Sequence, residues 1–253
     1  MKHTTTCWRQ AFALVELLII VMILAMLAAL LLPALAKAKS KAQRISCVNN
    51  LKQISIGYRL WEGDNGDLTP AAQTVSKGGW ADLLAKPDQG ALCWTNYAIL
   101  ANELGQAPKL LICPADERQP AANFARDFKD NTHVSYFVGV SANDEHPQSI
   151  QGGDRNLGSG AEPGPDYGYS PESGKGNDVA VPVNSARQTV CWSLKMHSGG
   201  NPAGAANISL GDGSVQQVTS ANFGQNFLRY ADPTTNWPVG RAPATPSIRL
   251  IFP

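Results

Sequence analysis

The sequence predicts an α+β protein in which a long N-terminal helix, half transmembrane and half amphipathic, packs on a head with an antiparallel β-sheet. Three observations predict this fold. Residues 12–32 are apolar with one exception, residues 33–62 repeat apolar side chains every three to four positions, and residues 63–253 hold short apolar runs between turn residues. With 253 residues and 43% apolar content, the chain is long enough for one globular domain and an appendage.

Charge is divided unevenly along the chain. Residues 1–59 carry eight Lys or Arg against the single acid Glu16, whereas residues 60–253 carry 13 bases against 19 acids. A portion with an acidic excess repels a phosphate backbone. The composition therefore argues against a nucleic-acid partner.

The apolar segment reads FALVELLIIVMILAMLAALLL. A helix of its 21 residues is about 30 Å long, which matches the hydrocarbon core of a bilayer. A secretory signal peptide would have a shorter apolar region, no acid within it and a cleavage site after it. The segment therefore predicts a single transmembrane helix, with membrane lipid as a partner.

Glu16 is the one charged residue in this segment. A charge inside a membrane costs about 2.5–3.5 kcal/mol on insertion scales, so the position needs an explanation. Either Glu16 lies near the interface and reaches toward water, or a partner charge reaches it on assembly.

The run AFALVE, residues 11–16, resembles the processing site of type IV prepilins and type II secretion pseudopilins. In that family a small residue, usually Gly, precedes the cut, Phe follows it, and Glu is the fifth mature residue. Phe12 and Glu16 match this pattern, whereas Ala11 replaces the usual Gly and Ala13 the frequent Thr. Pro33 falls where pilins commonly place a proline.

The resemblance implies that a prepilin peptidase cuts between Ala11 and Phe12, that residues 1–11 are the leader, and that Phe12 is N-methylated. It also implies that Glu16 acts in assembly. The partners would be the peptidase, other pilin or pseudopilin subunits and an inner-membrane assembly platform. The chain would be a single-pass protein of the bacterial inner membrane, with its head in the periplasm or outside the cell.

The charges flanking the apolar segment favour the opposite orientation. Bases at positions 37, 39, 41 and 44 outnumber Lys2 and Arg9, and the positive-inside rule would place the head in the cytoplasm. We follow the resemblance because the processing motif is more specific than a count of charges.

An amphipathic stem helix is predicted over residues 33–62. Pro33 removes one backbone hydrogen bond, so we expect a kink there rather than two separate helices. Gly63, Asn65 and Gly66 are expected to end the helix. The head is expected to pack on an apolar stripe that consists of Ile45, Leu51, Ile54, Tyr58 and Trp61.

The head, residues 63–253, is predicted from short patterned runs. Gly211, Asp212 and Gly213 indicate a hairpin turn between two of its strands. Thr95 is expected to be the N-cap of a short helix. Strands are predicted at 132–141, 188–194, 206–210 and 214–218, helices at 80–86 and 95–104, and irregular segments at 152–178 and 231–247.

Four of the five cysteines follow the membrane segment. Cys47, Cys93, Cys113 and Cys191 allow three disulfide pairings in an exported domain, and buried unpaired thiols are the alternative. No C-x-x-C spacing is present, so local spacing does not support a zinc site.

Asp64 and Asp67 are candidate calcium ligands in an acidic turn. The turn lacks the spread of acids and the terminal Glu of an EF-hand loop, so we favour a helix-ending turn. No cofactor is therefore expected, with calcium as the one candidate.

The segment from Cys47 to Pro70 resembles a bacterial subgroup of pseudopilin-like proteins with an "H-x9-DG" motif in the C-terminal region. Shorter patches at 111–116, 135–139 and 153–156 also match. His197 and Asp212-Gly213 correspond to the motif, but 14 residues separate His197 from Asp212. Either His197 orients a turn while Asp212-Gly213 close a hairpin, or the motif acts in maturation or assembly.

No enzyme is predicted, since G-x-S-x-G, H-E-x-x-H and P-loop patterns are absent. The expected function is a structural subunit of a type II secretion pseudopilus or a type IV pilus-like filament. The alternative is a membrane-anchored extracytoplasmic binding protein or enzyme that uses a pilin-like export segment.

Overall fold

A computed structural model describes residues 6–84, 93–143, 146–176, 178–182, 190–198, 204–228 and 247–253. The chain divides into two compact units, Met1–Ala42 and Gln43–Pro253. Nearly all of the predicted irregular segment 231–247 lies outside the described residues.

Helix α1 (Thr6–Asp64) is continuous through Pro33, as the sequence predicted. The kink expected at Pro33 stays a prediction. The helix ends where expected, because Gly66 adopts a left-handed φ of 71° and the Asn65 side-chain amide donates to the Trp61 carbonyl over 2.8 Å.

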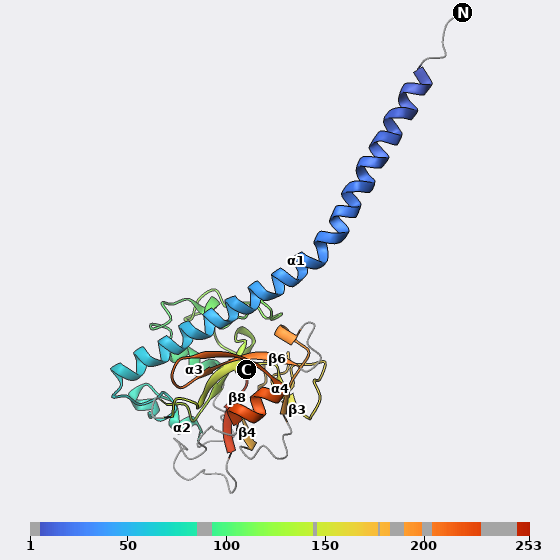
Figure 1. The fold of residues 1–253 in the computed structure, drawn as a ribbon. Coiled ribbons are helices and arrows are strands. Elements are labelled where there is room, and N and C mark those ends of the chain that lie inside the picture. Colours follow the sequence, from blue (N-terminus) through green and yellow to red (C-terminus); the bar gives the residue numbers. More distant parts are fainter. Residues whose placement is uncertain are drawn as a thin grey trace, which may run out of the picture. The chain divides into compact units, whose positions relative to one another are not determined.

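The head is built on a six-stranded sheet with the spatial order β4-β8-β1-β2-β6-β7. Figure 1 labels β4, β6 and β8 of this sheet. All neighbouring strands run antiparallel, which confirms the predicted sheet type. The strands of this sheet are β1 (Tyr136–Gly139), β2 (Ile150–Asp154), β4 (Asp178–Pro182), β6 (Ala205–Leu210), β7 (Val215–Thr219) and β8 (Ser247–Ile251), and a second sheet pairs β3 (Leu157–Ser159) with β5 (Val190–Trp192).

Short helices and turns surround the sheet. The prediction of Thr95 as an N-cap is wrong, because α3 begins two residues earlier at Cys93. In its first turn the Trp94 backbone N–H donates to the Asn131 side chain over 2.9 Å. The short elements are η1 (Val75–Lys77), α2 (Ala81–Leu84), α3 (Cys93–Ile99), η3 (Pro108–Leu111), η4 (Asn131–His133), η6 (Met196–Ser198), α4 (Ser220–Asn222) and η7 (Phe223–Leu228).

The predicted strands at 188–194, 206–210 and 214–218 correspond to β5, β6 and β7, and Gly211–Gly213 form the turn between the last two. The strand predicted from residue 132 begins only at Tyr136. Residues 131–133 form η4 instead, because the Asp130 carboxylate accepts the Thr132 N–H over 2.9 Å.

The prediction of an irregular segment at 152–178 is wrong at its start, where β2 continues to Asp154 and β3 follows. The glycines that suggested a turn are needed for close strand packing. A Cβ on Gly153 would lie 2.8 Å from the ring carbon Cζ of Phe137 and 2.9 Å from the Asn207 carbonyl oxygen.

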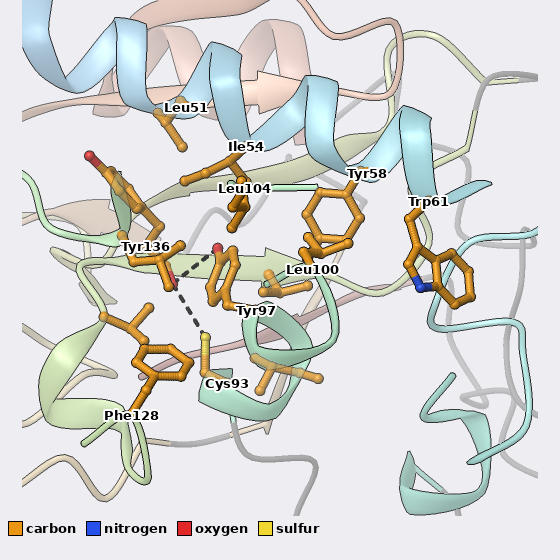
Figure 2. Packing of buried hydrophobic residues seen from close by; sticks show 14 of the residues in the cluster. Leu51, Ile54, Tyr58, Trp61, Cys93, Tyr97, Leu100, Leu104, Phe128 and Tyr136 are labelled. Atoms are coloured by element: carbon orange, nitrogen blue, oxygen red, sulfur yellow. Dashed lines mark hydrogen bonds between the residues drawn. The ribbon is translucent and has the colours of Figure 1, made fainter. Parts of the chain in front are cut away.

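Two apolar clusters occupy the two faces of the sheet. Tyr136 and Val138 of β1 belong to one cluster, and Phe137 belongs to the other, as the alternation of a strand requires. The first cluster contains residues from the C-terminal part of α1 (Figure 2). These helix residues are Cys47, Leu51, Ile54, Tyr58 and Trp61.

The predicted apolar stripe is therefore correct at four of its five positions. The prediction is wrong at Ile45, which is 58% exposed. Cys47 takes the first place on the buried face, four residues before Leu51 and one helical turn away.

Candidate functional site

The N-terminal part of α1 carries the predicted processing and assembly residues. Ala11 and Phe12 lie within the helix, and Glu16 lies four residues further on with an exposed side chain. The described residues contain one helix long and apolar enough to cross a membrane. Every side chain from Leu14 to Ala42 is exposed in the single chain.

The candidate calcium residues lie where α1 ends. Asp64 is its last residue, Asp67 follows with a φ of 59°, and both are exposed. The part of the chain that the structure describes contains one group of at least three His, Cys, Asp or Glu side chains that converge, and neither residue belongs to it.

The structure does not bring His197 and Asp212 into one group. Asp212 is exposed in the β6–β7 turn, where its carboxylate accepts the Ser214 N–H over 2.8 Å, and Gly213 has a left-handed φ of 78°. Asp212 and Gly213 therefore close a hairpin, as one reading of the motif proposed. His197 is buried in η6 with other partners.

The converging group consists of Cys47, Cys113, Asp154 and His197. Their donor atoms all lie within 4.8 Å of one another, and none of the four residues is more than 6% exposed. They come from α1, from the segment after η3, from the end of β2 and from η6. Four segments far apart in sequence thus form one centre inside the head.

The two sulfurs of this centre form the Cys47–Cys113 disulfide. The His197 imidazole Nε2 lies 3.1 Å from the Cys113 Sγ and 3.7 Å from the Asp154 Oδ2. The Asp154 Oδ1 lies 3.8 Å from the Cys47 Sγ. Imidazole and carboxylate therefore both face the disulfide.

Burial controls the ionisation of both polar residues in the centre. Burial raises the pKa of the Asp154 carboxyl to about 7, although hydrogen bonds from Asn207 and the charge of Arg44 lower it. Burial also lowers the pKa of His197 to about 4, and the nearby Arg44 charge adds to this effect. The imidazole is therefore neutral at neutral pH.

Polar neighbours hold the centre in place. The Asn207 backbone N–H and side-chain amide donate to the Asp154 Oδ2 over 2.6 and 2.9 Å. The Tyr136 hydroxyl lies 3.2 Å from the Cys47 Sγ, and the Asn50 side-chain amide donates to the Ile112 carbonyl over 3.0 Å. These contacts connect β6 to β2, and they connect α1 to β1 and to the segment after η3.

The remaining two cysteines of the head are free and buried. Burial raises the pKa of the Cys93 thiol well above its usual range. Of the two alternatives for the four cysteines, the disulfide therefore holds for Cys47 and Cys113, and the buried thiol holds for Cys93 and Cys191.

Sequence reasoning singled out His197 but assigned no role to Asp154 and no pairing to Cys47 and Cys113. A signal for the centre was present, because each of these residues lies in a stretch that resembled the pseudopilin-like subgroup. The patches at 111–116 and 153–156 hold Cys113 and Asp154. The matching patches therefore meet in space.

Comparisons with family models, with curated proteins and with solved structures found no match to this chain.

Proposed function

We propose that this chain is a structural subunit of a type II secretion pseudopilus or a type IV pilus-like filament, processed by a prepilin peptidase and assembled through its N-terminal helix. The observation that carries the proposal is the apolar surface of α1 between Leu14 and Leu32, all of which is exposed in the single chain.

Such a surface requires a partner. Burial of one Leu, Ile or Val side chain is worth roughly 1.5–3 kcal/mol, so a helix with this many exposed aliphatic side chains is strongly unfavourable in water. Leu18, Leu24 and Leu30 are 60%, 60% and 73% exposed. Lipid covers this surface before assembly, and the helices of neighbouring subunits cover it in a filament.

The head does not need this part of the helix for its core. Gln43–Pro253 forms a compact unit of its own, and the buried apolar residues that the structure describes begin at Cys47. A subunit of this design keeps a folded head while the apolar half of its helix leaves the membrane and packs in a filament.

Glu16 supplies the electrostatic part of the proposed assembly. Cleavage before Phe12 creates a positive amine four residues from the Glu16 carboxylate, and each charge alone is costly in a low dielectric. Pairing the Glu16 carboxylate with the Phe12 amine of a neighbouring subunit neutralises both. The pair also fixes the axial register of the incoming subunit.

The Glu16→Leu variant tests this proposal. The variant should insert in the membrane and be cleaved as the wild type is, yet fail to form filaments. Loss of one partner from a desolvated ion pair costs about 3–5 kcal/mol, which is enough to prevent addition at a filament tip. Val15→Leu, at the neighbouring exposed position, is the control and should assemble normally. Filaments of Glu16→Leu at the normal rate would contradict the proposed pairing.

The alternative, a membrane-anchored binding protein or enzyme, requires a site that ligands can enter. One pocket of the head, lined in part by Tyr58, Glu62 and Trp80, has a volume of about 10 Å³, which is room for a single water molecule. The centre around Asp154 and His197 has shifted pKa values, as active sites do, but its side chains are buried. Neither this pocket nor this centre offers a ligand the open site that the alternative requires.

A further inference from the structure

The buried centre of Cys47, Cys113, Asp154 and His197 contains the atoms of a complete metal site. Two thiols, one imidazole and one carboxylate are ligands that Zn²⁺ takes in proteins, and four protein ligands make a closed, structural site. The inference that follows concerns the stability of the head and is independent of the proposed assembly function.

The geometry fits a tetrahedral ion. Zn²⁺ bonds of about 2.0–2.3 Å to oxygen, nitrogen and sulfur give tetrahedral edges of about 3.4–3.8 Å between ligand atoms. The His197 Nε2 lies 3.1 Å from the Cys113 Sγ and 3.7 Å from the Asp154 Oδ2, and the Cys47 Sγ lies 3.8 Å from the Asp154 Oδ1. With Asp154 Oδ2 as the carboxylate ligand, two of the six edges of the tetrahedron are therefore 3.1 and 3.7 Å, and all the donor atoms lie within 4.8 Å of one another.

The edge between the two sulfurs cannot form while Cys47 and Cys113 share a disulfide bond. Once this bond is broken, two thiolates on one Zn²⁺ would lie about 3.8 Å apart. The Cα atoms of Cys47 and Cys113 are 5.2 Å apart, so rotation about the side-chain bonds can move the two sulfurs away from each other.

Outer hydrogen bonds of the kind that orient metal ligands are present. The Ala115 backbone N–H donates to the Cys113 Sγ over 3.4 Å, and the Tyr136 hydroxyl is 3.2 Å from the Cys47 Sγ. Both groups are donors that stabilise thiolate sulfur. Asn207 donates twice to the Asp154 Oδ2, which fixes the carboxylate.

The charges also balance. Two thiolates, one carboxylate and one Zn²⁺ leave a single negative charge in a buried place, which is costly unless a cation lies nearby. The Arg44 guanidinium interacts with Asp154 and is held by the Asn207 side-chain oxygen at 3.3 Å and the Ala206 carbonyl at 3.2 Å. Arg44 thus supplies the compensating charge.

We propose that this centre has two forms, a metal-free disulfide and a dithiol that binds one Zn²⁺ through Cys47, Cys113, Asp154 and His197. Two molecules of an external thiol reduce the Cys47–Cys113 bond. The external thiols become a disulfide, and their two hydrogens pass to the cysteine sulfurs. Zn²⁺ then displaces the thiol protons, and the proton of Asp154 where one is present, into solvent. Either form ties the stem helix to the head.

The experiment compares both forms of the full-length chain in detergent. Thiol titration in denaturant defines the forms, with five thiols in the reduced chain and three when the Cys47–Cys113 bond is present. After incubation with Zn²⁺ and removal of the excess, the reduced chain should retain about one ion and the oxidised chain none. Co²⁺ should give a thiolate charge-transfer band with the reduced chain alone.

Single substitutions assign the ligands. Loss of a hydrogen bond to a metal ligand weakens metal binding by about 10–100-fold. His197→Asn and Asp154→Asn remove a ligand itself, so each should weaken Zn²⁺ binding to the reduced chain by more than that. Cys191→Ser, a buried cysteine outside the centre, should bind Zn²⁺ as the wild type does. The comparison of reduced with oxidised wild type does not depend on whether a variant folds. Equal zinc contents in these two forms, or full binding by His197→Asn, would overturn the proposal.

Discussion

Arg155 and Asp116 form a two-point ion pair inside the head. The Arg155 Nε and Nη2 donate to the two carboxylate oxygens of Asp116 over 2.7 and 2.8 Å, and both side chains are at most 1% exposed. The third nitrogen of Arg155 donates to the Ser170 carbonyl over 2.9 Å, and its guanidinium lies over the Tyr167 ring. The pair therefore joins the segment after η3, the loop after β2 and the loop after β3.

Substitution of one member of this pair should destabilise the head strongly. Asp116→Asn leaves the Arg155 charge buried without its partner, and such a change costs about 3–5 kcal/mol. Chemical denaturation of the full chain in detergent measures the loss. The control is Glu117→Gln, which removes the next acid along the chain from an exposed pair with Lys195 and should cost at most about 1 kcal/mol. Similar losses for the two variants would show that the buried pair contributes little.

The same pair predicts how stability depends on pH. Burial alone would raise the pKa of Asp116, but the hydrogen bonds and charge of Arg155 lower it below its ordinary value of 3.8. The folded state therefore binds a proton less readily than the unfolded state does, and the stabilisation is complete above the unfolded pKa. The free-energy difference between wild type and Asp116→Asn should be constant above about pH 5 and shrink as the pH falls below 3.8. A difference that grows toward low pH would contradict a lowered pKa of Asp116 in the folded state.

Two isoleucines of α1 differ in burial, and substituting each one tests which face of the helix packs on the head. Ile54 is 2% exposed in the first core cluster, and Ile56, two residues later, is 56% exposed. Ile54→Ala should lower the free energy of unfolding by about 2–5 kcal/mol, since it removes buried carbon and leaves a cavity. Ile56→Ala should change it by no more than about 0.5 kcal/mol. Equal losses in denaturant titrations would mean that the other face of the helix packs on the head.

The head should fold without the membrane segment. A chain beginning at Ala34 retains the compact unit Gln43–Pro253 and removes the most apolar part of α1. We expect it to be soluble in detergent-free buffer and to unfold in one cooperative transition. Circular dichroism during heating checks this. Aggregation with no cooperative transition would show that the head depends on the segment before residue 34.

The sequence predicted the elements that local patterns specify. The spacing of Leu51, Ile54 and Tyr58 identified the buried face of α1, and Gly211–Gly213 located the β6–β7 hairpin. It failed at β2, because glycines that permit close strand packing have the same local pattern as glycines that form a turn. Gly153 shows this, since its neighbour Phe137 belongs to another strand.

The buried centre could not be predicted from local sequence patterns, because its residues lie far apart in the sequence. Its two cysteines are 66 residues apart, and its acid and histidine come from β2 and η6. A zinc motif is recognised in sequence by short spacing between ligands, which this centre does not have. Only the fold of the sheet brings Cys47, Cys113, Asp154 and His197 together.

The central claim is that the N-terminal helix is processed and then used for assembly, and mass spectrometry of the mature N-terminus tests it most directly. The protein recovered from the membrane of its native host should begin at N-methylated Phe12 and retain the whole apolar segment. Replacement of Ala11 by a bulky residue should leave the uncut precursor in the membrane. A mature protein that begins after Leu32 would indicate ordinary signal-peptidase cleavage and would contradict the account.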